Sequence, residues 1–389
     1  MPHAQVGPPL RCGIALVGSL APLIAFEAED ISIHGFVSQG YNLTTENTSL
    51  PGSEDGTFEF NEIGLNVASQ LTDRLRVGIQ LFSRDYGTLG NNTVELDWAY
   101  GDYSYRQWLG IRVGRFKTPT GLYNEYRDLD LARVQVQLPD SAYSNHFRDV
   151  AVATNGIALY GNVPIADGAG GDIDYDLFTG DLRLDPDGSM GLIFGNGFIS
   201  EITDTDLKYI HGARLIWNTP LDGLRVGSSY TYYDDLYAAG PSAVPPGGTG
   251  SFLFDLYHYY FSAEYIWQDW TFAAEYNRMR GESTVVVNQA IPPSSARVER
   301  EGWYLMANYQ IDPQWSAGVY YSEHYPDAND RDGDDDDPDF KAWEKVISLS
   351  TRYDVDDHWL LKAEIQSVNG TANLFARDNP DGFEEDWLN

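Results

Sequence analysis

Residues 75–84 read LRVGIQLFSR, a stretch in which apolar side chains alternate with polar or small ones. The apolar set consists of Leu75, Val77, Ile79 and Leu81. The set between them includes Arg76, Gly78, Gln80 and Arg84. Because successive side chains of a β-strand point to opposite faces, this stretch predicts a strand with one apolar face and one polar face.

The same alternation recurs along the chain, for example in residues 270–278 (WTFAAEYNR) and 358–367 (HWLLKAEIQS). It predicts about fifteen strands, which start near Ile31, Thr57, Arg74, Thr93, Trp108, Val150, Gly171, Leu207, Leu224, Ser251, Trp270, Val298, Gln314, Ala342 and His358. Many short alternating segments without a long apolar stretch are typical of a transmembrane β-barrel.

The connections between these segments alternate between short and long. The short ones are residues 71–75, 105–108, 218–223, 267–270, 311–315 and 355–359. Long polar segments, such as the acidic runs 326–340 and 377–387, lie between them. A soluble β-sandwich also has alternating strands, but tight turns at one end and long loops at the other predict an all-β, antiparallel, up-and-down barrel.

Tryptophan placement supports the same fold. Six tryptophans lie in or beside the short connections: Trp108, Trp217, Trp267, Trp270, Trp315 and Trp359. If all the short turns lie at one end, these indoles form a ring where a membrane meets water, which is the environment that suits an amphipathic aromatic side chain.

The strand count leaves the barrel one strand short. Bacterial barrels of a single chain have an even number of strands, so the type expected here has sixteen. The last residues, DWLN, follow a long loop without forming a further strand in the pattern. We therefore expect the closing strand to be absent from this chain or supplied by something else, since an open barrel leaves unpaired backbone groups in lipid.

The N-terminal segment, the single cysteine and the net charge limit the location and partners of the protein. A weakly basic start and the apolar segment CGIALVGSLAPLIAF predict a signal peptide over residues 1–28, followed by one barrel domain, residues 29–389, in the bacterial outer membrane. Cys12, the only cysteine, lies in that peptide, so no disulfide is expected. A net charge of −33 argues against nucleic acid as a partner.

The longest connection, residues 118–149, is the candidate functional segment. It carries enough apolar side chains to fold, so we expect it to turn into the lumen and narrow it. The residues expected at this constriction are Tyr123, Arg127, Asp128, Asp130, Arg133 and Arg148. Their charges are expected to face water in a confined space, where they act strongly on passing ions.

Strand parity also assigns basic side chains to the lumen wall. They are Arg76, Arg84, Arg112, Arg214, Arg225, Arg300, Arg352 and Lys362, against the carboxylates Glu95, Asp97, Glu275 and Glu364. Rows of Arg and Lys favour anions, so an anion or oxyanion preference is one hypothesis. Acidic outer loops would instead enrich cations, and pairing of Arg with lumen carboxylates would give a weakly selective pore.

Two stretches carry a resemblance to a known family. Residues 114–143 (GRFKTPTGLYNEYRDLDLARVQVQLPDSAY), followed by FRD, resemble the third-loop region of Gram-negative porins related to the phosphate-selective porin O and P family. Residues 360–387 resemble the penultimate strand and last loop of those porins. The resemblance implies a sixteen-stranded, trimeric barrel with a constriction loop in each pore. Its partners would be outer-membrane lipid, lipopolysaccharide and small ionic solutes.

Three other roles are compatible with parts of the sequence. A non-conducting barrel that serves binding or adhesion fits the same pattern. A membrane-embedded hydrolase would need a nucleophile and a base, and His146 near Ser141 and Ser144 is the only local candidate. Residues 327–339 match a calcium loop only loosely, although diffuse binding of Ca²⁺ or Mg²⁺ there is compatible with their charge. We expect a passive porin, with no enzyme activity, no cofactor and no specific metal site.

Overall fold

The computed structural model describes residues 31–194, 199–243, 248–287 and 292–389, and the expected signal peptide, residues 1–28, lies outside them. The described chain forms one antiparallel sheet of seventeen strands. Fifteen are long: β1 (Ile31–Gln39), β2 (Phe60–Thr72), β3 (Leu75–Tyr86), β4 (Glu95–Arg106), β5 (Leu109–Lys117), β6 (Ala153–Pro164), β7 (Asp172–Asp181), β9 (Tyr209–Asn218), β10 (Leu224–Pro241), β11 (Thr249–Trp267), β12 (Trp270–Val287), β13 (Ser294–Gln310), β14 (Trp315–Tyr325), β15 (Glu344–Asp354) and β16 (Leu360–Gly370). These correspond one to one with the fifteen expected strands.

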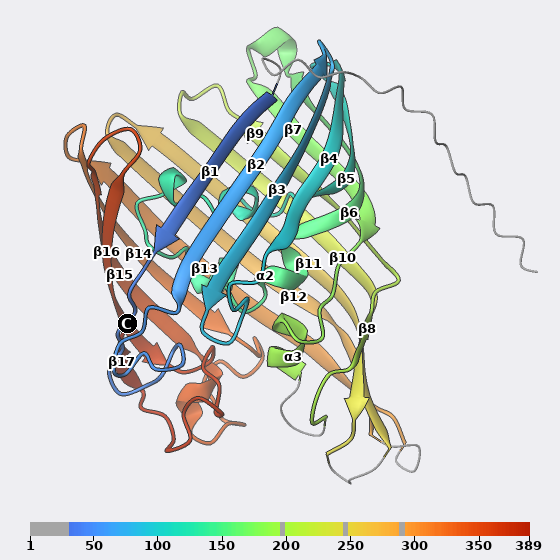
Figure 1. Cartoon of the computed structure of the whole chain (residues 1–389), viewed down its shortest axis with the longest axis vertical. Coiled ribbons are helices and arrows are strands. Elements are labelled where there is room, and N and C mark those ends of the chain that lie inside the picture. Colours follow the sequence, from blue (N-terminus) through green and yellow to red (C-terminus); the bar gives the residue numbers. More distant parts are fainter. Residues whose placement is uncertain (1–30, 195–198, 244–247, 288–291) are drawn as a thin grey trace, which may run out of the picture.

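Each long strand pairs with the next one along the chain, so the topology is up and down as expected. The short strand β8 (Asp204–Asp206) and β9 both pair with β10, and together they form one interrupted strand. Figure 1 shows the sheet curving around an interior, with helices α2 (Arg148–Ala151) and α3 (Ser189–Phe194) inside the curve. No helix among the described residues combines the length and apolar character needed to cross a bilayer.

The two ends of the sheet meet at one rim. The last residues, DWLN, were expected to lie outside any strand, but Asp386–Leu388 forms β17 and pairs with the end of β16. On its other side β17 contacts the chain that follows β1: the Thr45 N–H donates to the Leu388 carbonyl at 3.0 Å, and the Asn42 amide donates to Asn389 Oδ1 at 2.6 Å. Within the described residues, β1 itself pairs only with β2, so the sheet is not closed along the rest of this seam (Figure 1).

The exposure of the side chains is opposite to that of a soluble protein. On β15, Ile347 and Leu349 are 53% and 57% exposed, whereas Ser348 and Ser350 between and after them are 0% and 6% exposed. The same outward apolar positions recur around the sheet at Leu65, Ile79, Ile157, Leu177, Leu215, Phe261, Leu305 and Leu361. Soluble monomers rarely expose so continuous an apolar belt, and a bilayer is the environment that covers one.

The tryptophan expectation is confirmed in its geometry. Trp108, Trp217, Trp267, Trp315 and Trp359 are all exposed at the end of the sheet that carries the short turns. Trp270, the first residue of β12 after the short turn, stacks on Phe272 with the two ring centroids 5.5 Å apart. An aromatic rim therefore borders the apolar belt on the side of the short turns.

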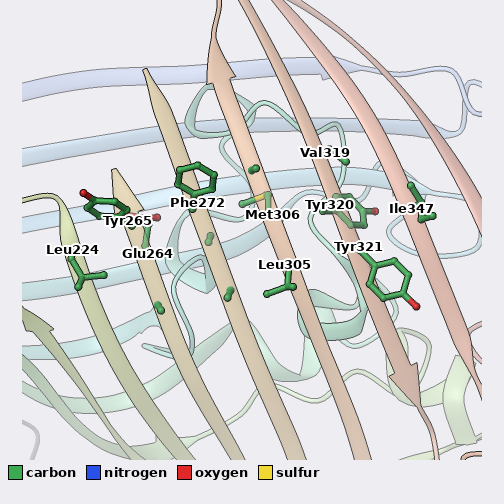
Figure 2. A pocket seen from close by; sticks show the side chains of 14 residues that line it. Leu224, Glu264, Tyr265, Phe272, Leu305, Met306, Val319, Tyr320, Tyr321 and Ile347 are labelled. Atoms are coloured by element: carbon green, nitrogen blue, oxygen red, sulfur yellow. The ribbon is translucent and has the colours of Figure 1, made fainter. Parts of the chain in front are cut away.

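The apolar belt is hollowed over β10–β15. A groove of about 660 Å³ lies there, and small side chains form part of its lining: Ala263, Ala274 and Ala307. Ala263 and Ala274 are direct cross-strand neighbours, which leaves a depression between larger groups. Figure 2 shows Phe272, Leu305, Tyr321 and Ile347 around it. The groove is thus lined mainly by apolar and aromatic side chains, with Glu264 as its one charged lining residue among those described.

If the belt contacts lipid, the cost of a charge on it depends on depth. We expect Leu349→Arg to reduce the free energy of unfolding in lipid vesicles by about 2–4 kcal/mol, because Leu349 lies well inside the belt. The control Trp359→Arg, at the rim, should cost about 0–1 kcal/mol. Urea titration measures both. Equal costs for the two variants would contradict the assignment of the belt.

Candidate functional site

Residues 118–152 connect β5 to β6 and lie against the inner faces of distant strands. The segment contains the short helices η2 (Asn124–Tyr126), η3 (Asp130–Ala132), α1 (Asp140–Tyr143) and α2. Its buried apolar side chains Leu122, Leu138 and Tyr143 pack with wall residues such as Tyr260 of β11 and Tyr304 of β13. We call this segment the inner loop. Apolar packing against the wall is the first contribution that holds it there.

A buried carboxylate fixes the start of the inner loop. Glu275 of β12 is 2% exposed and accepts hydrogen bonds from the hydroxyls of Tyr143, Ser262 and Tyr304. The N–H of Leu122 lies 2.9 Å from a Glu275 oxygen and 2.9 Å from the Tyr143 hydroxyl oxygen. A buried charge is tolerated only when such donors replace water. Two of the four donors, Leu122 and Tyr143, belong to the inner loop, so they join the loop to the wall.

A second anchor is a cluster of four charged side chains that includes Asp128 and Arg148 of the inner loop. Arg148 donates to both Asp128 oxygens at 2.8 and 2.7 Å, and Lys117 of β5 donates to Asp128 at 2.5 Å. Lys117 also donates to Asp97 of β4 at 2.7 Å. Burial alone would raise the pKa of Asp128, but Arg148 and Lys117 hold it well below its usual range.

An irregularity in β4 places Asp97 in this cluster. The register between β3 and β4 shifts at this point, because Gln80 pairs with Trp98 while Leu81 pairs with Leu96. Asp97 is the extra residue of this bulge, and it is 4% exposed on the inner side. A bulge re-aims a side chain in this way.

The far part of the inner loop is tied to β15 and β16. Lys362 donates to Asp130 at 3.2 Å and to the Gln135 carbonyl at 3.0 Å. Arg352 donates to the Leu131 carbonyl at 2.6 Å, and Arg133 pairs with Asp130 at 2.9 Å. On the opposite wall, Glu125 pairs with Arg214 of β9 at 2.6 Å. The inner loop therefore contacts walls on both sides of the lumen.

Part of the sequence expectation for this loop is wrong. Arg127, Asp128 and Arg148 were expected to face water, but they are 8%, 4% and 4% exposed. The Arg127 guanidinium donates to the carbonyls of Tyr143 and Ser144 at 2.7 and 3.1 Å. These charges hold the loop together, because a buried ion needs partners that replace its water. The exposed residues of the inner loop are Tyr126, Leu129, Leu131 and Ala132.

The structure brings most of the assigned wall cations into contact with carboxylates or with the inner loop. Arg112 pairs with Asp102, Arg214 with Asp176, Arg225 with Glu264, Arg352 with Asp354, Arg84 with Asp149 and Lys362 with Asp130. Arg300 instead lies over the Phe147 ring, with its guanidinium carbon 4.6 Å from the ring centroid. Arg76 is exposed near the short turn of β3.

Sequence reasoning missed several anchors. Lys117 is the last residue of β5, where the chain turns inward and parity no longer decides which side a residue faces. Gln135 reaches Asn308 of β13 at 2.6 Å, a contact between residues far apart in sequence. Tyr143 was not among the predicted site residues, although its hydroxyl donates to Glu275. The run of charges beside tyrosines in residues 123–133 was the one signal in the sequence for such a network.

His146 and Ser141, two of the residues that a hydrolase would need, have other partners. The His146 ring packs edge-on against Tyr86 and Phe375, with centroids 5.9 and 4.8 Å away. The Ser141 hydroxyl donates to the Trp303 carbonyl at 3.2 Å. Neither contact is the pairing of a nucleophile with its base.

Some carboxylates of the acidic loop 327–339 accept hydrogen bonds from the loop itself. Asp330 accepts the N–H groups of Asp334 and Asp335 at 2.9 and 3.1 Å. Among the described residues, carboxylates gather as closely as metal ligands at Asp234, Asp235 and Asp255. The Lys208 ammonium lies 2.9 Å from Asp234 and 3.5 Å from Asp235, so a cation already occupies that position.

Comparisons with known proteins bear on the fold. The sequence matches no protein-family model and no curated protein. Solved structures do match: the anion-selective porin from Comamonas acidovorans has a TM-score of 0.53 at 12% identity, over 88% of this chain and 90% of that one. The outer membrane channel DcaP of Acinetobacter baumannii gives 0.53 at 12% identity, over 93% and 96%. Salmonella typhi OmpF gives 0.54 at 12% identity, over 92% and 95%.

The fold is that of a bacterial outer-membrane porin. Proteins of this fold are built into the outer membrane, and the apolar belt described above is the surface that such a membrane covers. Loops vary more between proteins of one fold than strands do, and the long loops and the inner loop belong to this variable part.

The Tyr143 hydroxyl gives a test of the inner-loop anchor. Tyr143→Phe removes one donor to buried Glu275 and one acceptor for the Leu122 and Tyr123 N–H groups. We expect it to lower the free energy of unfolding by about 1–3 kcal/mol. The matched control Tyr126→Phe, whose ring is exposed, should have little effect. Equal unfolding midpoints in urea for the two variants would rule out the anchor.

His146 predicts a pH dependence of loop docking. Burial lowers the pKa of His146 below its ordinary value, so the folded protein binds fewer protons there than the unfolded chain does. Its contribution to stability is complete above about pH 6.5 and is lost as the pH falls below that value. We therefore expect the urea midpoint to fall between pH 7.5 and pH 5, and His146→Phe to reduce that fall. His358→Phe, at an exposed turn, is the control and should leave the fall unchanged.

Proposed function

We propose that the chain is an outer-membrane porin, a passive channel for small polar or ionic solutes rather than an enzyme. The observation that carries the proposal is the sidedness of the strands, with apolar groups exposed outside and serines, carboxylates and arginines inside. A soluble protein buries the apolar side. An outward belt suited to lipid leaves the polar side for water and solutes.

The inner loop is the proposed constriction. Of the six residues assigned to it, Arg127, Asp128 and Arg148 are buried, so in this proposal they fix the shape of the constriction from behind. Tyr123 donates to Glu264 at 3.0 Å, and Asp130 and Arg133 join the contacts to β16. The surface that a solute meets would be formed by exposed groups of the loop and by wall charges such as Arg112 and Arg225.

Selectivity is proposed to be weak, with at most a modest preference for anions. Most wall arginines have a carboxylate partner at hydrogen-bond distance, as in the Arg112–Asp102 pair at 3.0 Å and the Arg225–Glu264 pair at 2.8 Å. Such pairs reduce the net field on a passing ion. A strong phosphate selectivity like that of the family it resembles would call for a row of unpaired cations. A trimer embedded in lipid and lipopolysaccharide remains the proposed assembly.

A non-conducting barrel that binds a ligand is the second candidate. The observation in its favour is that the inner loop contacts Arg214 on one wall and Arg352 on the other, and so crosses the lumen. A loop that blocked the lumen would make the protein a receptor or adhesin rather than a channel.

Planar-bilayer recording separates the two candidates. Folded, purified protein should produce stepwise openings whose current is proportional to voltage. A folded protein that produces no openings would contradict the porin proposal and favour the binding barrel.

The paired wall charges predict how selectivity changes. Glu264→Gln leaves Arg225, which is 39% exposed in the wall, without its carboxylate, so the reversal potential in a salt gradient should shift toward anion preference. Glu299→Gln removes a carboxylate from the Arg278 pair near the long loops and is the control, with no shift expected. An unchanged reversal potential in Glu264→Gln would exclude Arg225 from the ion path.

A further inference from the structure

A cavity of about 120 Å³ lies between the inner loop, α3 and the inner faces of β10–β14. Apolar side chains from all three regions line it, among them Phe147 of the inner loop, Met190 of α3, and Leu236, Leu256 and Met279 of the strands. A concave space with an apolar wall and a few polar groups is the usual form of a small-molecule site.

The polar groups of this cavity are unusual for the lumen. Arg127 and Arg300 both line it, and within the described residues neither has a carboxylate at salt-bridge distance, unlike the paired wall cations. Arg127, 8% exposed, is held by the Tyr143 and Ser144 carbonyls. The Arg300 guanidinium is held 3.1 Å from Nε2 of His324 and above the Phe147 ring.

One carboxylate lines the cavity together with these two cations. Asp140 also lines the cavity, and one of its oxygens accepts the Asn145 N–H at 3.0 Å. A guanidinium is always charged and has five N–H donors, of which the His324 contact uses one. The cavity wall therefore keeps an excess of positive charge with donors left to satisfy.

We propose that this cavity binds small solutes that carry one carboxylate on a compact apolar body. The proposal rests on the proposed function, since it names the solutes that would pause in the lumen. Arg300 would receive the carboxylate, because the planar guanidinium matches a carboxylate with two parallel hydrogen bonds. Phe147, Leu256 and Met279 would contact the apolar body.

The size of the cavity and the cost of removing water from the anion favour a carboxylate on an apolar body over inorganic phosphate. At about 120 Å³ and partly open, this cavity is smaller than the cavity of about 150 Å³ that holds a benzene molecule, so it suits an apolar body no larger than one ring. A phosphate dianion would lose its hydration against the apolar wall without donors on every side. Benzoate is therefore the probe that the site fits, and phosphate is the anion that it should reject.

Titration calorimetry on the full folded protein in detergent tests the site. Benzoate should bind at least tenfold more tightly than benzamide, which has the same shape without the charge, and than formate, which has the charge without the body. Inorganic phosphate should not compete with benzoate. Equal binding of benzoate and benzamide, or tighter binding of phosphate than of benzoate, would overturn the proposal.

Substitutions locate the site. Arg300→Gln should weaken benzoate binding at least tenfold. The affinity of Arg300→Lys should lie between those of the unchanged protein and Arg300→Gln, since lysine keeps the charge but cannot donate two parallel hydrogen bonds. Arg106→Gln, at the short-turn end of β4, is the control and should bind benzoate like the unchanged protein. Benzoate binding that Arg300→Gln leaves unaltered would overturn the assignment. Should Arg300→Gln not fold, the comparison of ligands on the unchanged protein still decides.

Calorimetry measures binding without ion flow, so the porin proposal and the binding-site proposal can be contradicted independently. Protein that binds benzoate and does not conduct would overturn the porin proposal and leave this site standing. Protein that conducts and shows no preference for benzoate would overturn this site alone.

Discussion

The alternation of side chains along a strand is the constraint on which the rest of this structure depends. Because neighbouring residues point to opposite faces, one sheet can be apolar toward lipid and polar toward its interior. The sheet curves so that strands far apart in sequence face one another across the lumen (Figure 1). Backbone hydrogen bonds are satisfied between neighbouring strands, and at one rim β17 bridges β16 and the chain after β1.

A polar interior creates a second problem, because the charges on it must be paired wherever the inner loop excludes water. Glu275 receives four donors, and Asp128 lies between Arg148 and Lys117. Such buried groups are costly to leave unpaired, so each contact that docks the loop also depends on the others. The loop is consequently a fixed part of the interior, and the cavity beside it, with two arginines that lack carboxylates, is where a solute could supply the missing charge.

The sequence predicted the regular parts of the fold and not its exceptions. Period-two alternation and short turns were sufficient to locate the fifteen long strands and the tryptophan rim, since both depend only on local pattern. The bulge at Asp97 shifts the register by one residue, and no local signal in β4 marks it. The contact of Tyr143 with Glu275 joins residues far apart in sequence, so neither residue alone indicated the anchor. Burial reversed the expected role of Arg127, Asp128 and Arg148, because parity says which way a residue points and not what covers it.

Site-directed labelling of β7 tests the sidedness most directly. Asp176 points inward and pairs with Arg214, and the alternation along the strand places Asp174 on the same side. Leu177 is 47% exposed on the outside, and the same alternation places Tyr175 there. Single cysteines at these four positions would carry a fluorescent label on protein in lipid vesicles; Cys12, the only native cysteine, lies in the expected signal peptide. We predict that a lipid-bound quencher acts on the labels at 175 and 177 and that iodide in water acts on those at 174 and 176. Equal quenching by iodide at all four positions would contradict the account.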